Sequence, residues 1–471
     1  MLGLFGTLDL ARRAMQAQMT GVTVAGQNLA NVNTPGYSRQ RVDLATSPGL
    51  QTDIGMVGTG VNATSIDQVV SNLLNGQIQS QSSTSGFWTS QQSALQSAQA
   101  GLAEYLNGSG TTTDTSGGAT SSGLSGQLSN LFSAFQGVAA SPSSIPARQT
   151  LIGAAQGLAT MFNQVNTQLS SVKTSLNTSL NSDVGSANKL VSQIADLNKQ
   201  ISIDEFSGGT ANDLRDQREQ ALENLAGLAN ISTSAGANGA VDVSVGGQSL
   251  ISGRQVLDTL QTYDAGGGQM LVKTSAGGTP LTLTGGSMQG TIDARDGEVA
   301  TMQTNINTLA ANLISGVNSA YTSGYGLNGT TGANFFNGAD ASDISVNPAL
   351  ANDPSTFQAA NSATATGDNS VALNLAQLAD TAQSSLNNQS FGDYYGATVT
   401  GLGTALSNAN TQVTNQATVS DMLSTQRGSV SGVNIDEEMT NLLTFQRAYT
   451  ASAELLKTAD EMIQTTLGMK T

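Results

Sequence analysis

Residues 435–467, IDEEMTNLLTFQRAYTASAELLKTADEMIQTTL, carry the clearest periodic pattern in the chain. Every seventh position is apolar: Ile435, Leu442, Tyr449, Leu456 and Ile463. A second apolar row consists of Met439, Phe445, Ala453, Ala459 and Leu467. This repeat is typical of a helix with a coiled-coil seam. Because such a helix gains most of its stability by packing one face, the stretch predicts a helix that needs a partner.

The N-terminal end carries a matching pattern. Its apolar residues fall on one face of a predicted helix: Leu4, Leu8, Ala11, Met15, Val22, Ala25 and Leu29. The first 50 residues are mildly basic and the last helix is mildly acidic, which favours their juxtaposition. The two helices could pair within one chain or with copies in neighbouring molecules. We predict an assembly interface formed by Leu4, Leu8, Met15, Val22, Leu29, Ile435, Met439, Leu442, Tyr449, Leu456 and Ile463.

Helical spacing also dominates the middle of the chain. A long helix is predicted from about Ala147 to Ile201, with a potential break at Asp183–Gly185. Further helices are predicted over residues 66–106, 124–140, 288–320, 368–388 and 395–428. Sustained spacing over such lengths indicates a helical hairpin or bundle. Charged residues crowd the helix after the long one, and we interpret them as a solvated face on which Arg215 pairs with Glu219.

Residues 231–286 show a different pattern of apolar and polar residues. Val241, Val243 and Val245 alternate with polar residues before a pair of glycines, which is typical of strands and tight turns. The predicted fold is therefore mainly α with an inserted β domain (α+β), built on a long antiparallel helical bundle. The predicted domains are a terminal helical assembly domain (1–40 and 431–471), a helical bundle (41–230 and 288–430) and a β-rich outer domain (231–287).

The composition argues against most enzyme chemistry. The sequence contains no histidine and no cysteine, which removes disulfides, the usual zinc ligands and Cys- or His-dependent catalysis. We predict no catalytic residue, no metal site and no cofactor.

The charge and hydropathy of the chain limit its partners. A net charge of −16 argues against nucleic acid and against anionic membrane surfaces. No apolar run reaches the roughly 18 residues that span a bilayer. Arg12 and Arg13 interrupt the single apolar region that could serve as a signal peptide, so we expect none.

The ends of both terminal helices have recognisable local signals. Asn33-Thr34-Pro35-Gly36 fits a type II turn after the first helix. At the other end, Asn434 is placed to cap the last helix, and Glu437 is placed to complete a capping box. Capping accounts for the acidic residues 436–438, so we predict no active site there.

Two stretches resemble a known family. Residues 28–40, NLANVNTPGYSRQ, and residues 431–449, SGVNIDEEMTNLLTFQRAY, resemble the terminal signatures of the bacterial flagellar rod/hook axial proteins. The predicted signature turn comprises Asn33, Pro35, Gly36 and Tyr37. The ending YSRQ and the long helical middle are most similar to the hook-associated members, as are the segments PARQ (146–149) and NDLRDQR (212–218). The resemblance is weakest over residues 230–290.

The resemblance implies a structural subunit and no enzyme. Its expected role is an adaptor that joins hook to filament and stacks with copies of itself through its terminal helices. The implied partners are the flagellar hook protein, the next hook-associated protein on the filament side, an export chaperone and the type III export apparatus. The implied location is extracellular, at the hook–filament junction, reached without a cleaved signal peptide.

Two alternatives remain open at this stage. A flagellar hook or distal rod protein shares both end motifs, although its middle is usually rich in β structure. An extracellular or cell-wall-processing enzyme fused to an axial scaffold would need a metal or carboxylate site in the middle region.

Overall fold

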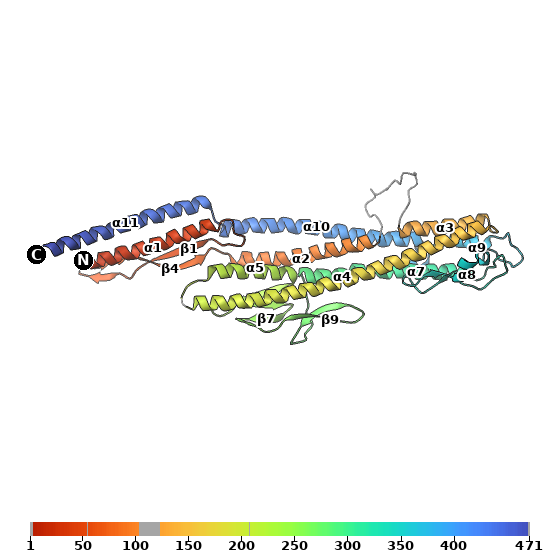
Figure 1. The fold of residues 1–471 in the computed structure, drawn as a ribbon, viewed down its shortest axis with the longest axis horizontal. Helices are drawn as coiled ribbons and strands as arrows, with labels where there is room; N and C mark the ends of the chain where they lie inside the picture. The colour runs from red at the N-terminus through yellow and green to blue at the C-terminus, as the bar shows by residue number, and fades with distance from the viewer. Residues whose placement is uncertain (1–2, 54, 103–122, 207, 470–471) are drawn as a thin grey trace.

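A computed structural model describes residues 3–53, 55–102, 123–206 and 208–469. The molecule is elongated, with both ends of the chain at one end and a long helical bundle leading away from them (Figure 1). The principal helices are α1 (Leu4–Ala30), α2 (Asn72–Gly101), α3 (Leu124–Ala140), α4 (Ile145–Glu205), α5 (Asn212–Leu228), α6 (Gly286–Ala294), α7 (Ala300–Tyr321), α8 (Pro348–Asn352), α9 (Ser370–Gln377), α10 (Phe391–Ser431) and α11 (Ile435–Gly468).

The strands form small antiparallel sheets. β1 pairs with β4 and β2 with β3 in a hairpin that extends beside α1, and β5 to β8 form a four-stranded sheet in chain order. β9 pairs with β10, and β11 (Phe336–Asn337) with β12 (Ser345–Val346). The other strands are β1 (Gln40–Thr46), β2 (Leu50–Thr52), β3 (Gly55–Val57), β4 (Val61–Gln68), β5 (Ile231–Ala235), β6 (Val241–Val245), β7 (Gln248–Ser252), β8 (Gln255–Val256), β9 (Leu260–Asp264) and β10 (Met270–Thr274).

The bundle is organised by α4, a single helix of 61 residues. At 1.5 Å per residue it is about 90 Å long. Ser144 caps its start by accepting a hydrogen bond from the Ala147 amide, and Pro146 lies in the first turn. Apolar residues at three- and four-residue steps are buried along most of its length. The expected break at Asp183–Gly185 is absent, because Val184 and Ala187 keep the buried stripe continuous.

Two hydrophobic clusters lie along α4. One fills the half of the bundle far from the chain ends, where Phe135, Tyr321, Phe335 and Phe357 form an aromatic group. The other joins the second half of α4 and α5 to the inner face of the β domain, where Val243, Val245 and Ile251 are buried. Among the described residues, neither cluster includes any residue of α1 or α11. The terminal helices therefore pack as a unit of their own.

Several predicted boundaries differ from the structure. Residues 66–68 belong to β4, and α2 begins at Asn72, because Ser71 caps its first turn. The segment 368–388 forms only α9 and a short 3-10 turn, with Asn387 and Asn388 in left-handed conformations that end it. β1 and β4, predicted to lie mainly in the bundle, pack beside α1. None of the described helices is long and apolar enough to cross a membrane.

Candidate assembly interface

The two terminal helices pack side by side within one chain (Figure 1). The face of α1 that is buried consists largely of small residues: Ala11, Ala17, Gly21, Val24 and Ala25. Gly21 lies directly against the ring of Phe445 on α11, since a Cβ added at Gly21 would meet that ring at 2.7 Å. The small residues thus let the backbones of α1 and α11 approach closely.

Substitutions at two glycines of α1 test this close approach. Gly21→Ala would push into the Phe445 ring, so we expect it to destabilise the helix pair by about 1–3 kcal/mol. Gly26→Ala meets nothing within 4 Å and should stabilise α1 by about 0.5–1 kcal/mol through helix propensity. Amide hydrogen exchange in α1 would measure both effects. Equal responses of the two variants would contradict the close packing.

The structure divides the predicted interface residues between this contact and the surface. On α1, Leu4, Leu8, Met15, Val22 and Leu29 are all half-buried. On α11, Leu442, Leu456 and Ile463 are half-buried, whereas Ile435, Met439 and Tyr449 are exposed. Further exposed apolar side chains are Phe5, Met19, Leu443, Leu455, Met462 and Leu467. Apolar surface therefore remains after the two helices have paired.

The signature turn lies where α1 ends. Tyr37 donates its amide hydrogen to the Thr34 carbonyl at 3.2 Å, and Gly36 has a φ of +80°. The turn therefore spans residues 34–37, one residue later than predicted, with Pro35 and Gly36 at its central positions. A positive φ at the third position is the requirement of a type II turn that glycine meets without strain. Asn33, Pro35 and Gly36 are exposed, and Tyr37 is half-buried.

Asn28 connects this turn to both terminal helices. Its side-chain oxygen accepts hydrogen bonds from the Tyr37 hydroxyl and the Gln40 amide, each at 2.9 Å. Its side-chain nitrogen donates to the Gln40 carbonyl at 2.8 Å and to a Glu438 carboxylate oxygen at 3.1 Å. Burial, with Asp213 nearby, raises the pKa of Tyr37 to about 12, so this hydroxyl stays protonated and can donate.

Arg39 and Glu438 form the charged part of the same cluster. Arg39 Nε lies 2.8 Å from Glu438, and its NH2 group lies 2.8 Å from Glu437. The Glu438 side chain is only 3% exposed, whereas that of Glu437 is 54% exposed. Asn434 caps α11 as predicted, by accepting from the amides of Asp436 and Glu437. The interpretation of Glu438 as a capping residue is incomplete, because its carboxylate binds Arg39 and Asn28 across the helix pair.

We call α1, α11 and the segment that follows α1 up to the end of β4 the terminal unit, leaving out residue 54. The first turns of α5 join this unit to the bundle. Asp216 accepts hydrogen bonds from the Ser38 amide at 2.9 Å and from the Gln68 side chain at 2.8 Å. Asp213 accepts from the Gln40 side chain at 2.9 Å. Burial raises the pKa of Asp216, consistent with a carboxylate enclosed between two units. A cleft of about 550 Å³ lies beside these contacts.

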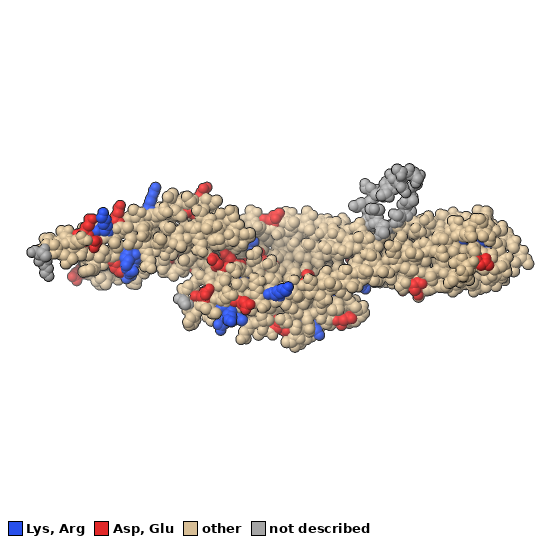
Figure 2. Space-filling view, viewed as in Figure 1, with Lys and Arg blue, Asp and Glu red and all other residues tan. Residues whose placement is uncertain are grey.

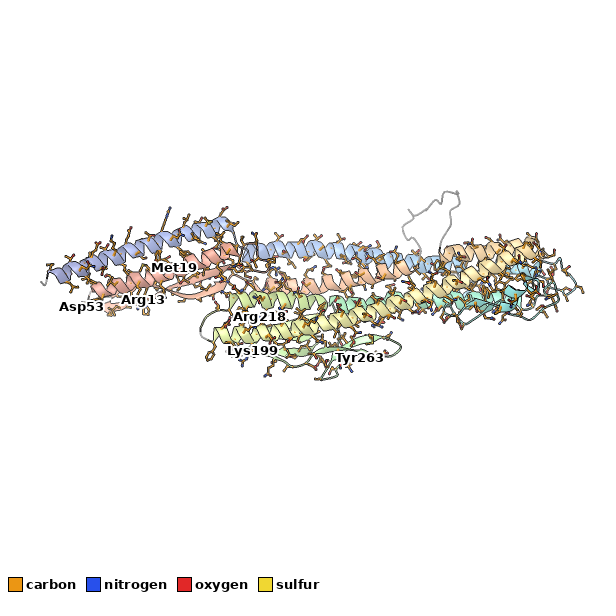
Figure 3. All side chains as sticks on the ribbon, in the orientation of Figure 1. Arg13, Met19, Asp53, Lys199, Arg218 and Tyr263 are labelled. Carbon is orange, nitrogen blue, oxygen red and sulfur yellow. The ribbon has the colours of Figure 1, made fainter. Side chains whose placement is uncertain are left out.

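The prediction of a solvated face on α5 is therefore wrong for several of its charged residues. Arg215 pairs with Glu205 at the end of α4, at 2.7 Å, and not with Glu219. Glu219 accepts from the Gln79 side chain at 2.8 Å, and burial raises its pKa. Local spacing could not reveal these partners, because they come from α2, the hairpin and α4. In Figure 3 the labelled Arg218 lies on α5, near where the bundle meets the terminal unit.

The Glu205–Arg215 pair predicts a pH-dependent stability. Hydrogen bonds from Arg215 hold the pKa of Glu205 below its usual value of 4.5. Its contribution to stability is thus present above that pH and is lost as the pH falls through the lowered pKa. We expect Glu205→Gln to be less stable than the unsubstituted protein at about pH 6, and the difference to shrink by about pH 3. Urea unfolding followed by circular dichroism would measure it, and a difference that is constant with pH would contradict it.

Charged groups are unevenly distributed over the face of the molecule shown in Figure 2. In the view of Figure 2 most lie over the terminal unit, α5 and the β domain, and the far half of the bundle shows few. Within the part of the chain that the structure describes, no three acidic side chains are placed to hold a metal ion.

Family models match three parts of the chain. The model described as flagellar hook-associated protein FlgK helical domain matches residues 110–336. The model described as flagellar basal body rod FlgEFG protein C-terminal matches residues 426–469, and the one described as flagella basal body rod protein matches residues 8–37. The two rod models thus fall on the terminal helices.

Curated relatives match almost the whole chain. Flagellar hook-associated protein 1 of Bacillus subtilis is 28% identical over 98% of both chains. The protein of the same name from Salmonella typhimurium is 24% identical over 98% of this chain and 99% of its own. The solved structure of the flagellar hook junction protein FlgK from Burkholderia pseudomallei has a similar fold, with a TM-score of 0.63, 16% identity and coverage of 75% of this chain and 100% of its own.

Proposed function

Because this chain belongs to the family of flagellar hook-associated protein 1, we propose that it joins the flagellar hook to the filament and assembles through α1 and α11. It is a structural component of the bacterial flagellum at the hook–filament junction. In this proposal, copies of the chain associate by packing their terminal helices.

The observation that carries this mechanism is the apolar surface left on the paired terminal helices. A groove of about 400 Å³ between α1 and α11 is lined by Met15, Met19 and Tyr449. On the solvent side, Phe5, Leu443 and Met462 are exposed. Exposed apolar residues gathered on one unit mark an interaction surface, and burying them would stabilise an assembly by about 25 cal/mol per Å². Figure 3 shows Met19 on α1 within this unit.

We infer the partners of the chain from its proposed role of joining the hook to the filament. The chain assembles with other flagellar components. The proposed partners are copies of itself, the hook protein, the next hook-associated protein on the filament side, and an export chaperone with the type III export apparatus. We propose that it acts without catalysis, without nucleic acid or membrane, and outside the cell after export. The lack of histidine and cysteine and the net charge of −16 support this proposal.

Electron microscopy of cells that lack the gene, with an assay for flagellin in the medium, tests the proposal. We expect hooks without filaments and flagellin lost to the medium. Loss of the hook itself would instead favour a flagellar hook or distal rod protein. Normal flagella in a strain with no second copy of the gene would overturn the assignment.

A further inference from the structure

A groove of about 610 Å³ separates α2 from β5 at the edge of the β domain. One wall is a face of α2 that includes Ser80 and Thr84, and the other is formed by Ser232 and Thr233. Phe87 and Trp88 lie in the groove, with their rings edge to face at a centroid distance of 5.0 Å. The groove therefore combines a polar rim with an aromatic surface.

The strand that borders this groove is an edge strand. β5 is the first strand in the sheet order β5-β6-β7-β8, and no other strand of the described residues pairs with its outer side. Residues 232–235 of β5 are all exposed. An exposed strand edge is a template for a further strand, which would gain backbone hydrogen bonds along the edge and place its side chains in the adjacent groove.

The chain also carries a segment suited to this edge. We call residues 40–53 and 55–68 the arm; it consists of the β1–β4 ladder with the paired strands β2 and β3 at its tip. Within the described residues, β3 pairs only with β2. At the tip Leu50 and Met56 are exposed, Met56 by 70%. Two strands alone are marginally stable in water, so a tip with exposed apolar side chains gains from a further surface.

The arm and the groove cannot meet within one molecule. In Figure 3, Asp53 at the tip lies at the end of the molecule that holds the chain termini, whereas in Figure 1 β7 and β9 of the β domain lie beside the middle of the bundle. A second copy is the occupant that the chain itself supplies. The described residues that line the groove carry no charge, and Asp53 is the single charged residue among positions 50–57, so the lining itself places no acidic side chain against the tip.

We propose that β3 of one copy adds to the edge of β5 in a neighbouring copy, with Met56 seated against Phe87 and Trp88. A methionine sulfur packs favourably against aromatic rings, and its flexible side chain adapts to an irregular groove. This inference rests on the proposed function, because that function places copies of the chain side by side. It adds a specific contact between the arm and the bundle to the packing of the terminal helices.

Cross-linking tests the contact between copies. The chain has no cysteine, so Thr233→Cys and Val57→Cys each introduce a single thiol, and a disulfide between the two variants must join two molecules. Both would be expressed together in cells lacking the gene, and isolated flagella would be oxidised. We expect a product of twice the chain mass of 47.9 kDa. The matched control replaces Thr233→Cys with Ser384→Cys, an exposed position in the far half of the bundle.

Each outcome decides the proposal. The expected product in the Thr233 mixture and its absence in the control would support it. Filaments that form without this product, equal yields in both mixtures, or a link to a protein of another mass would overturn it. Filaments that form without this product would leave the proposed junction function standing, so the failure of this inference can be told apart from the failure of that function.

A second measurement uses Trp88, the single tryptophan of the chain. We expect its fluorescence to shift to shorter wavelength when the full-length protein assembles, because the arm of another copy would exclude water from the groove. Thr233→Lys should abolish this shift. When one copy carries Thr233→Lys together with Ser232→Cys, and another copy carries Val57→Cys, the disulfide between the two copies should also be lost. Ser234→Lys is the matched control, since Ser234 is exposed on the same strand and does not line the groove. Equal behaviour of the two lysine variants would overturn the proposal.

Discussion

Cells whose only copy of this chain carries Leu456→Asp are expected to make hooks without filaments. Leu456 is half-buried on α11, so the substitution removes roughly 1–2 kcal/mol of apolar burial and adds the cost of desolvating a carboxylate. Leu442→Asp should behave in the same way, because Leu442 lies two repeats earlier in the same seven-residue row and is also half-buried. Electron microscopy and a swimming assay would measure the effect.

The bundle of the Leu456→Asp protein should remain folded. Neither hydrophobic cluster of the bundle includes a described residue of α11, so the thermal unfolding of purified protein should change little. Gln446→Asp is the matched control, since it adds the same charge to α11 at an exposed position outside the apolar rows. Filaments of normal length on Leu456→Asp cells would argue against assembly through the terminal helices.

Glu438→Ala is expected to destabilise the terminal unit by about 1–3 kcal/mol, the usual cost of leaving buried polar groups without one of their partners. The substitution leaves Arg39 without its buried partner and Asn28 without one acceptor. Amide hydrogen exchange in α1 and α11 of the full-length protein would show the loss as faster exchange confined to this unit.

Glu437→Ala is the control for this prediction. It contacts the same Arg39 at the same 2.8 Å distance, but its side chain is 54% exposed, so its loss should cost only about 0–1 kcal/mol. The double substitution Arg39→Met with Glu438→Leu should recover much of the stability lost in Glu438→Ala, because no buried charge is left unpaired. Equal effects of Glu437→Ala and Glu438→Ala would show that the buried pair does not hold the helices together.

Together these features describe a chain with two structural parts, the terminal unit and the bundle. Small residues and apolar rows bring α1 and α11 together, and a polar cluster around Asn28, Arg39 and Glu438 fixes their register. Hydrogen bonds to Asp213 and Asp216 connect this terminal unit to the bundle. Polar contacts of this kind fix orientation by their geometry.

The sequence by itself determined the helices at both ends, the long central helix, the inserted β domain and the family. Seven-residue and three- or four-residue spacing reports the local geometry of a helix, and alternation reports that of a strand. The cap at Asn434 and the turn with Pro35 and Gly36 were also predictable, because each depends on residues that are adjacent in the chain.

The tertiary structure alone decided which side chains meet. Glu438 lies 410 residues from Asn28 in the chain, and Asp216 lies 178 residues from Ser38. Helix capping explains the sequence around Glu438, and an exposed helix face explains the sequence around Asp216, without any distant partner. Their actual partners depend on how whole helices are placed side by side, which spacing does not encode. The physical reason is that the local sequence around a carboxylate is the same whether the carboxylate is exposed or buried. Its burial against a distant partner is decided only when the helices and the bundle pack together.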